Sequence, residues 1–305
     1  MRQLAIACLL IALLLLGNGC RPTATPPPAG ASSLRVVAIE PFLQDIAQNV
    51  AGERVTVDVL MPSGADPHSY EPAPQDVAKI ANAQVVIING AGLETFLERL
   101  LTTAGGQQRL IDASAGLESR EVDEHEGEAH EHESDPHFWL DPNLVIAYVE
   151  NIRDGLSEAD PDGAAAYAAN ATAYIAQLQE LDQWITSQVQ QVPPERRLLV
   201  TNHESFGYYA DRYGFRVIGT LIPSVSSLAS PSAQQLAQLV DQIRATGAPA
   251  IFLESGTNPQ LAQQVAQEAG VRLVTGLYTH TPGPDAPTYI GMIRYNTSKI
   301  VEALK

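Results

Sequence analysis

The feature that most constrains this chain is an alternation of strand-like and helix-like stretches that occurs twice. Short apolar stretches alternate with amphipathic stretches of helical length, first over residues 34–114 and again from Arg197 onward. Strands separated by helices of this length form βαβ units, whose strands lie parallel in one sheet. The sequence therefore predicts an α/β protein with two lobes, each containing a mostly parallel sheet flanked by helices.

The boundaries of these elements follow from the apolar periodicity and from the Gly and Pro residues between the stretches. In the first lobe the expected strands are 34–40, 54–62, 84–90 and 108–114, and the expected helices are 41–52, 73–83 and 93–106. In the second lobe the expected strands are 197–203, 215–222, 249–255 and 271–277, and the expected helices are 205–213, 231–246, 258–270 and 288–304.

A long Ala-rich stretch separates the two alternating regions. Over residues 161–192 apolar side chains recur at helical spacing, and proline residues bound the stretch at both ends. We expect one long rigid helix that joins an N-terminal lobe, 34–160, to a C-terminal lobe, 193–305. The alternative is a helix that packs wholly on one lobe. Two lobes joined in this way leave a cleft where the carboxyl ends of the strands meet.

The first residues of the chain have the pattern of an export signal. An apolar run from Leu4 to Leu16 is short for a membrane span and is typical of a secretory signal, here 1–19. Small residues precede Cys20, as in bacterial lipoproteins, so we expect Cys20 to be lipidated and residues 20–33 to form a Pro-rich tether. The alternative is an ordinary cleaved signal. We therefore expect an exported protein, lipid-anchored on the outer face of the cytoplasmic membrane.

Charge and cysteine content exclude several classes of partner and site. The chain has 18 Lys and Arg against 35 Asp and Glu residues, a formal net charge of −17. A surface this acidic repels phosphate backbones, so no nucleic-acid partner is expected, whereas cation binding is compatible with it. The 2 cysteines cannot support a disulfide framework or a Cys-based zinc finger. We expect a monomer.

Four of the seven histidines stand at the predicted cleft. His68 lies in GADPHSYEP after a strand, His137 in DPHFWLDP before a helix, His203 in TNHESFGYYA after a strand, and His280 in LYTHTPG after the last strand. Four neutral imidazoles form a complete tetrahedral set for Zn²⁺. Imidazole also suits nickel and copper, whereas manganese prefers more oxygen ligands. The pattern predicts a metal site, most simply for zinc.

The chain resembles the metal-specific solute-binding lipoproteins of bacterial ABC importers, which deliver zinc or manganese. Four motifs carry this resemblance: GADPHSYEP, HFWLDP, NHESFGYYA and the terminal TYIGMIRYN (288–296). The resemblance covers residues 34–304. It implies two α/β lobes, one long connecting helix and a single metal ion held between the lobes, with His68, His137 and His203 as ligands. In this family an acidic residue often occupies the fourth position. His280 matches that place here, and Glu254 and Asp285 are the alternatives.

An all-histidine site leaves the charge of the metal uncompensated among its direct ligands. Carboxylates nearby are then expected to orient the rings through their second N–H. The candidates are Asp66, Glu71, Asp135, Asp141, Glu204 and Glu254, and each could instead be a helix cap or a loop carboxylate. Asp141, which precedes Pro142, looks as much like a cap as a partner of a ring.

Residues 121–135 form an acidic loop that also contains His125, His130 and His132. Such a composition lacks the apolar side chains that a packed structure needs. One interpretation is a solvated insertion. The other is an auxiliary loop that collects metal weakly near the cleft, and in this family His-rich loops at this place suggest zinc.

Two functional classes remain open besides transport. A zinc-dependent hydrolase would use His68, His137 and His203 with Glu254 or Glu204 as general base, but four ligands would close the coordination sphere. No H-E-x-x-H, G-x-S-x-G or P-loop motif occurs in the chain. An adhesin or structural lipoprotein is the third possibility. We expect a non-enzymatic carrier that captures Zn²⁺, or alternatively Mn²⁺, and delivers it to a membrane permease. The alternative within the family is a manganese/iron-type binding protein.

Overall fold

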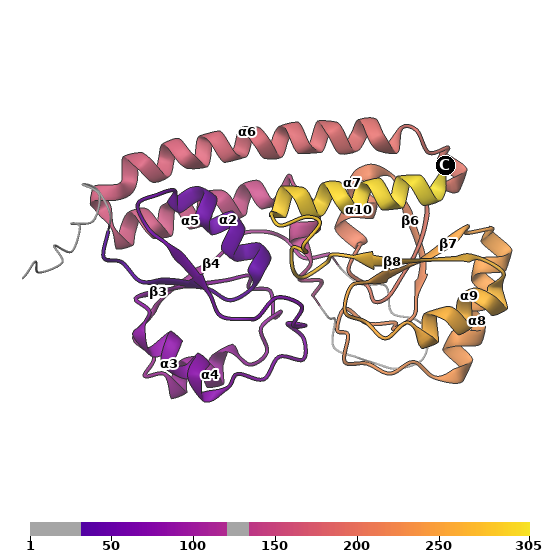
Figure 1. Ribbon diagram of the computed structural model, residues 1–305, viewed down its shortest axis with the longest axis horizontal. Helices are drawn as coiled ribbons and strands as arrows, with labels where there is room; N and C mark the ends of the chain where they lie inside the picture. The colour runs from indigo at the N-terminus through magenta and orange to yellow at the C-terminus, as the bar shows by residue number, and fades with distance from the viewer. Residues whose placement is uncertain (1–31, 121–133) are drawn as a thin grey trace, which may run out of the picture. The chain divides into compact units, whose positions relative to one another are not determined.

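The computed structural model describes residues 32–120 and 134–305, and Ser32–Lys305 form one compact unit (Figure 1). The predicted signal, Cys20 and the tether to residue 31 lie outside the described residues, as do His125, His130 and His132. Below, the N-terminal half means the described residues before helix α6, and the C-terminal half means those after it.

The N-terminal half contains one parallel sheet of four strands in the order β2-β1-β3-β4. Val36 of the central strand β1 pairs with Val57 on one side and Val85 on the other. Each strand lies within its predicted range. The strands are β1 (Val36–Ala38), β2 (Val57–Val59), β3 (Val85–Ile88) and β4 (Arg109–Asp112).

Alternating side chains of the strands explain why both faces of this sheet are covered. Val36 and Ala38 pack into one hydrophobic cluster with Phe42 of helix α2 (Pro41–Ala51). Val37 packs into a second cluster on the other face, which helices α3 (Pro74–Asn82) and α4 (Leu97–Thr103) cover. Because successive side chains of a strand point to opposite faces, an unbroken apolar strand needs helices on both sides.

The C-terminal half differs from the expectation of a single second sheet. Its strands form two separate parallel pairs, β5-β6 and β7-β8. Each pair carries a register shift, between Leu199 and Val200 and between Leu253 and Glu254. The strands are β5 (Leu198–Thr201), β6 (Arg216–Thr220), β7 (Ala250–Glu254) and β8 (Arg272–Leu277), and the helices are α7 (Gly207–Tyr213), α8 (Ala233–Thr246), α9 (Gln260–Ala269) and α10 (Tyr289–Leu304).

Local capping explains where two of these helices begin. The Ser232 hydroxyl accepts the N–H of Gln235, and the Gln235 side chain accepts the N–H of Ser232, which is the reciprocal capping arrangement. The Thr288 hydroxyl accepts the N–H of Gly291 at 3.0 Å at the start of α10. These caps place the loops before α8 and α10, and the second of those loops contains His280.

Helix α6 (Ala164–Val189) has 26 residues and lies within the expected 161–192 stretch. It packs against α2 and α5 (Leu144–Ala159) of the N-terminal half and against α7 and α10 of the C-terminal half. Figure 1 shows α6 running past both sets of sheets. The fold is therefore the predicted α/β type, with parallel sheets flanked by helices, and α6 contacts both halves.

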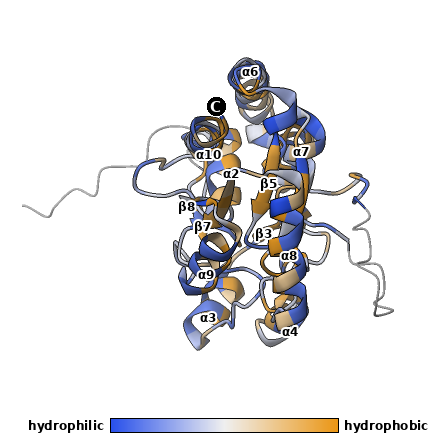
Figure 2. Ribbon diagram, turned by 90° about the vertical axis from the view of Figure 1, so that its right-hand side faces the viewer, coloured by the Kyte–Doolittle hydropathy of each residue, from blue (hydrophilic) through white to orange (hydrophobic). Residues whose placement is uncertain are grey.

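The largest hydrophobic core belongs to both halves at once. It includes residues of α2, α5, α6, β5, β7 and α10, among them Phe42, Tyr174, Leu199 and Leu304. In Figure 2 the strand β5 carries strongly hydrophobic colours, whereas many residues of α3 are coloured as hydrophilic. Within the described part of the chain, no helix combines the length and the apolar character needed to cross a membrane.

Candidate metal centre

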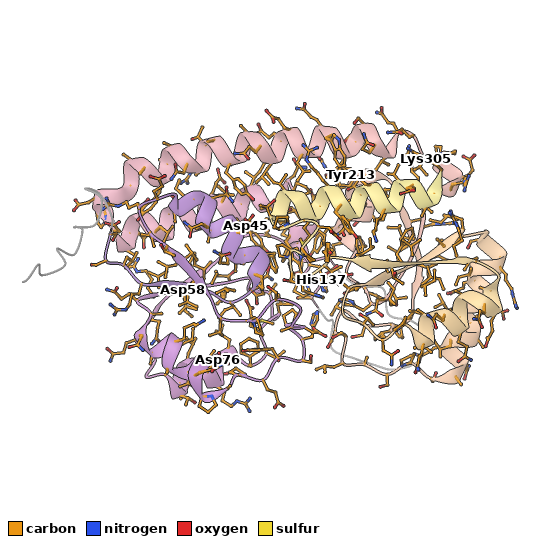
Figure 3. The ribbon with its side chains drawn as sticks, in the orientation of Figure 1. Asp45, Asp58, Asp76, His137, Tyr213 and Lys305 are labelled. Atoms are coloured by element: carbon orange, nitrogen blue, oxygen red, sulfur yellow. The ribbon has the colours of Figure 1, made fainter. Side chains whose placement is uncertain are left out.

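The four cleft histidines come from four different loops. His68 follows β2, His203 follows β5 and His280 follows β8, so each stands beyond the carboxyl end of a parallel strand. His137 directly precedes a 3₁₀ turn, Phe138–Leu140, that leads into α5. Figure 3 shows His137 between the two halves. The predicted clustering at strand ends is thus what the structure shows.

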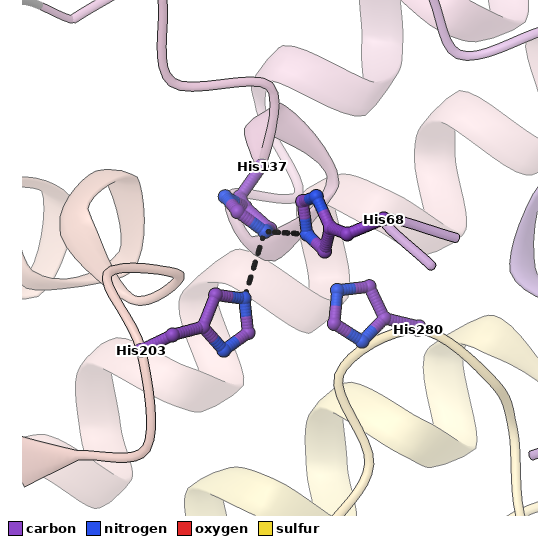
Figure 4. Close-up of side chains that lie close together, drawn as sticks. All are labelled: His68, His137, His203 and His280. Atoms are coloured by element: carbon purple, nitrogen blue, oxygen red, sulfur yellow. Dashed lines mark hydrogen bonds between the residues drawn. The ribbon is translucent and has the colours of Figure 1, made fainter. Parts of the chain in front are cut away.

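These four imidazoles converge on one point (Figure 4). Nε2 of His137 lies 3.3 Å from Nε2 of His68 and 3.2 Å from Nε2 of His203. One nitrogen from each of the four rings lies within 4.8 Å of all the others. Four nitrogens at about 2.0–2.1 Å from a central Zn²⁺ would be about 3.3–3.4 Å apart, close to the two measured separations. The rings therefore stand in an arrangement that can enclose a tetrahedral ion.

Asp135 orients His137 from inside the N-terminal half. Its Oδ1 lies 2.8 Å from Nδ1 of His137 and also accepts the backbone N–H of that residue. Burial raises the pKa of Asp135 to about 6, although the His137 N–H and the Arg120 guanidinium lower it. The Tyr208 hydroxyl donates to the carbonyl of Asp135 at 2.7 Å. Asp135 thus directs Nε2 of His137, the opposite nitrogen, toward the other rings.

Glu254, at the end of β7, serves two rings of the C-terminal half. One oxygen lies 2.7 Å from Nδ1 of His203, an ion-pair contact rather than a well-aligned hydrogen bond. The other oxygen accepts the Thr279 hydroxyl at 2.6 Å and lies 3.7 Å from Nδ1 of His280. Burial alone would raise the pKa of Glu254, but the charge of His203 lowers it to about 2. Glu254 is therefore an anion shared by two imidazoles.

The protonation of the rings differs from site to site. Burial, with repulsion from His203, lowers the pKa of His68 to about 4. Burial also lowers the pKa of His137 and of His280 well below the usual value. Burial opposes the charged form of His203 as well, but Glu254 raises its pKa above the usual value. Burial therefore favours the neutral form of His68, His137 and His280, whereas Glu254 favours the protonated form of His203.

Two other predicted carboxylates accept hydrogen bonds from backbone N–H groups. Asp66 accepts the backbone N–H of His68 at 2.9 Å and so shapes the loop rather than the ring. Asp141 accepts the N–H of Asn143 at the start of α5. Glu71 and Asp285 are exposed, and Glu204 is outside the group of four converging residues. Asp135 and Glu254 together supply two negative charges beside the rings, equal to the charge of one divalent ion.

Two neighbours of the rings were missed by sequence reasoning. The indole N–H of Trp139 donates to the carbonyl of Thr279 at 2.6 Å. The Thr279 hydroxyl in turn lies 3.1 Å from Nδ1 of His280. Their closeness in sequence to the histidines could have pointed to them, since Trp139 stands two residues after His137 and Thr279 directly precedes His280.

Two cavities border the group of four rings. One, of about 210 Å³, is lined by Asp66, Ser227, Glu254 and His280. The other, of about 430 Å³, is lined by residues that include His68, Pro136 and Leu228. His68 and His280 are the ligand candidates with some exposure, 7% and 8%, whereas His137 and His203 have none. His68 and His280 are therefore the two rings that solvent can reach.

Comparison with known proteins gives a consistent family relationship. Residues 36–303 match the family described as zinc-uptake complex component A, periplasmic. The chain is 34% identical to the manganese-binding lipoprotein MntA of Halalkalibacterium halodurans, over 100% of this chain and 99% of that protein.

Solved structures share the fold as well. The Mn-bound periplasmic metal-binding protein of Candidatus Liberibacter asiaticus has a TM-score of 0.79 at 30% identity, covering 89% of this chain and 100% of that one. A crystal structure of ZnuA has a TM-score of 0.79 at 29% identity, covering 90% of this chain and 100% of that one. These similarities extend over almost all of the described residues.

Proposed function

We propose that this chain, which belongs to the zinc-uptake complex component A family of periplasmic proteins, captures Zn²⁺ with His68, His137, His203 and His280 and delivers it to a membrane permease. Proteins of this family are the extracytoplasmic, metal-binding components of ABC transporters, and so is this chain. The ion is the transported substrate.

The observation that carries this proposal is the convergence of four buried imidazoles with two buried carboxylates behind them. Nitrogen-only coordination favours zinc over manganese, which prefers oxygen ligands. Asp135 and Glu254 balance the two charges of the ion without entering its coordination sphere. Manganese is the second candidate, because the 34% identical relative MntA is described as manganese-binding.

The geometry supports capture rather than hydrolysis. A catalytic zinc needs an open position and a free general base. Here a fourth ring lies with the other three, and Glu254 is engaged by His203 and Thr279. The carboxylate that a hydrolase would require is therefore already occupied in orienting ligands.

The remaining parts of the proposal concern how the protein works at the membrane. Lobes 34–160 and 193–305 each contribute two ligands, and the helix within 161–192 restricts their motion to a small tilt or to loop movements. Lipidated Cys20 anchors a monomer through its tether, and His125, His130 and His132 collect metal weakly for the main site. Binding of the ion favours the closed arrangement, which the permease must open.

The experiment that tests the function is a metal-content measurement by mass spectrometry, followed by competition titration with zinc and manganese. We expect one tightly held zinc per chain. Loss of one of four ligands in His280→Ala should weaken zinc binding by about 10²- to 10³-fold, since structural zinc sites contribute about 10–16 kcal/mol in all. Equal zinc affinity in His280→Ala would remove His280 from the site, and a preference of the unaltered chain for manganese would contradict the assignment of zinc.

A further inference from the structure

We propose that Trp139 is a positioning residue that fixes His280 as the fourth ligand and so favours four-nitrogen coordination of the cargo. This inference rests on the proposed function. It concerns a side chain that lies outside the group of converging residues and carries no ionisable group.

Trp139 links the loops that carry one ligand from each half. It is completely buried and lies two residues after His137. Its indole N–H donates at 2.6 Å to the carbonyl of Thr279, the residue before His280. The centroid of its ring lies 5.1 Å from that of His137 and 5.8 Å from that of His280. A single side chain therefore sets the distance between a ligand loop of each half.

The indole is itself held in one orientation. Phe42 of α2 stacks on it with a centroid distance of 4.4 Å and an interplanar angle of 18°. The Tyr289 hydroxyl, from the start of α10, donates to the carbonyl of Trp139 at 2.6 Å. The backbone N–H of Tyr289 donates to Asp45 of α2 at 2.8 Å. With its ring and its backbone both held, Trp139 points its N–H in a fixed direction.

Thr279 connects the position of Trp139 to the orientation of the His280 ring. A hydroxyl has one proton, and that of Thr279 goes to Glu254 at 2.6 Å. Toward Nδ1 of His280, 3.1 Å away, the same oxygen must then act as acceptor, which places the ring proton on Nδ1. Nε2 of His280 is left as a buried lone pair without a hydrogen-bond partner. Trp139 thus holds the backbone, and Thr279 selects the tautomer that binds metal.

This arrangement also bears on the choice of metal. A fixed fourth imidazole suits an ion that accepts four nitrogens in a tetrahedron. If the loop of His280 moves, water can take the fourth position. An oxygen ligand in place of imidazole lowers the affinity for zinc but not that for manganese. Trp139 is therefore expected to affect zinc more than manganese.

The test compares Trp139→Phe with the unaltered chain by competition titration and by the absorption spectrum of bound Co²⁺. Phe keeps an aromatic ring against Phe42 but lacks the N–H. Zinc affinity should fall by about 10- to 100-fold, the usual effect of losing a group that orients a ligand. Manganese affinity should change much less. The intense visible bands of tetrahedral Co²⁺ should weaken toward the spectrum of His280→Ala, an effect that a general loss of stability would not produce.

The chain provides a matched control in its other tryptophan. Trp184 of α6 packs against the Arg294 guanidinium, 4.6 Å from the ring centroid, and Trp184→Phe should leave both zinc affinity and the Co²⁺ spectrum unchanged. If Trp139→Phe does not fold, the same measurements are made on Tyr289→Phe. This variant removes only the hydroxyl that donates to the carbonyl of Trp139. A smaller loss of zinc affinity with the same spectral change is expected.

The possible outcomes separate the inference from the function on which it rests. A folded Trp139→Phe, or Tyr289→Phe in its place, with the zinc affinity and Co²⁺ spectrum of the unaltered chain would overturn the role of Trp139 alone. An unaltered chain that binds no zinc, or whose Co²⁺ spectrum lacks the tetrahedral bands, would overturn the proposed four-histidine carrier.

Discussion

The two halves contribute two rings each to the site but compensate charge in different ways. In the N-terminal half, His137 pairs with Asp135, which is two residues away in the chain. In the C-terminal half, His203 and His280 face the same carboxylate, Glu254. Glu254 ends β7, whereas His203 follows β5 and His280 follows β8. A local pair orients one ligand independently, whereas a shared carboxylate makes the positions of two ligands depend on one residue.

Among the carboxylates near the rings, the largest expected effect on zinc affinity comes from removing the shared one. In Glu254→Gln the neutral amide no longer attracts the N–H of His203 and interacts differently with Thr279 and His280. We expect zinc affinity to fall by about 100-fold, the upper end of the range for residues that orient ligands. Competition titration measures the change.

Asp135→Asn is the matched variant in the other half. Because Asp135 orients one ring, we expect a loss nearer 10-fold. Equal losses in the two variants would show that sharing a carboxylate has no energetic consequence.

The pH dependence of zinc binding should show the same asymmetry. Glu254 raises the pKa of His203 above the usual value, so His203 is the ring at which protons compete with the metal at the highest pH. Affinity should therefore fall as pH drops from 8 to 6, approaching about tenfold per pH unit below the pKa of His203. His68, with a pKa of about 4, adds to the slope only at lower pH.

Glu254→Gln sharpens this prediction. Without the carboxylate, burial should bring the pKa of His203 below its usual value, so the slope between pH 8 and pH 6 should largely disappear. Titrations at half-unit steps of pH in both proteins provide the measurement. Affinity of the unaltered chain that stays constant down to pH 5 would contradict an all-imidazole site.

The smallest effect on zinc affinity is expected from a buried carboxylate that has no imidazole partner. Glu40 is completely buried, and the side chain with which its carboxyl group interacts is that of Glu94. Burial, together with repulsion from Glu94, raises the pKa of Glu40 well above its usual range, and burial raises that of Glu94 to about 7. A carboxyl group whose pKa is raised by folding binds its proton more tightly in the native state. Stability therefore falls as pH rises through the native pKa.

Glu40→Gln removes the charge but keeps the shape of the side chain. At pH 8 we expect this variant to be more stable by about 1–3 kcal/mol, the usual cost of an unsatisfied buried polar group, with a smaller difference at pH 5. Urea unfolding at both pH values measures it, and zinc affinity should stay unchanged. A variant destabilised equally at both pH values would show that Glu40 is not a buried charge.

Much of the fold could be predicted because parallel strands covered on both faces are continuous apolar stretches, as β3 is. The division of the second sheet into two pairs could not, since the irregularity at Leu253 leaves no pattern in composition. The four rings were found because histidine is scarce and each one follows a strand or precedes a helix. The contact of Trp139 with Thr279 joins residues 140 positions apart, and only the packing of the halves reveals it.

The shared core has a mechanical consequence. Phe42, Tyr174 and Leu199 belong to one hydrophobic cluster although they come from the two halves and α6. Parting the halves far enough to uncover 400 Å² of that cluster would require work of about 10 kcal/mol, at about 25 cal/mol per Å². The loops of Asp66 and Ser227 are hydrogen-bonded to each other and line the cavity beside His280, and they can separate without uncovering this cluster. We therefore expect the metal ion to enter and leave through movement of these loops, while the two halves and α6 keep their relative positions.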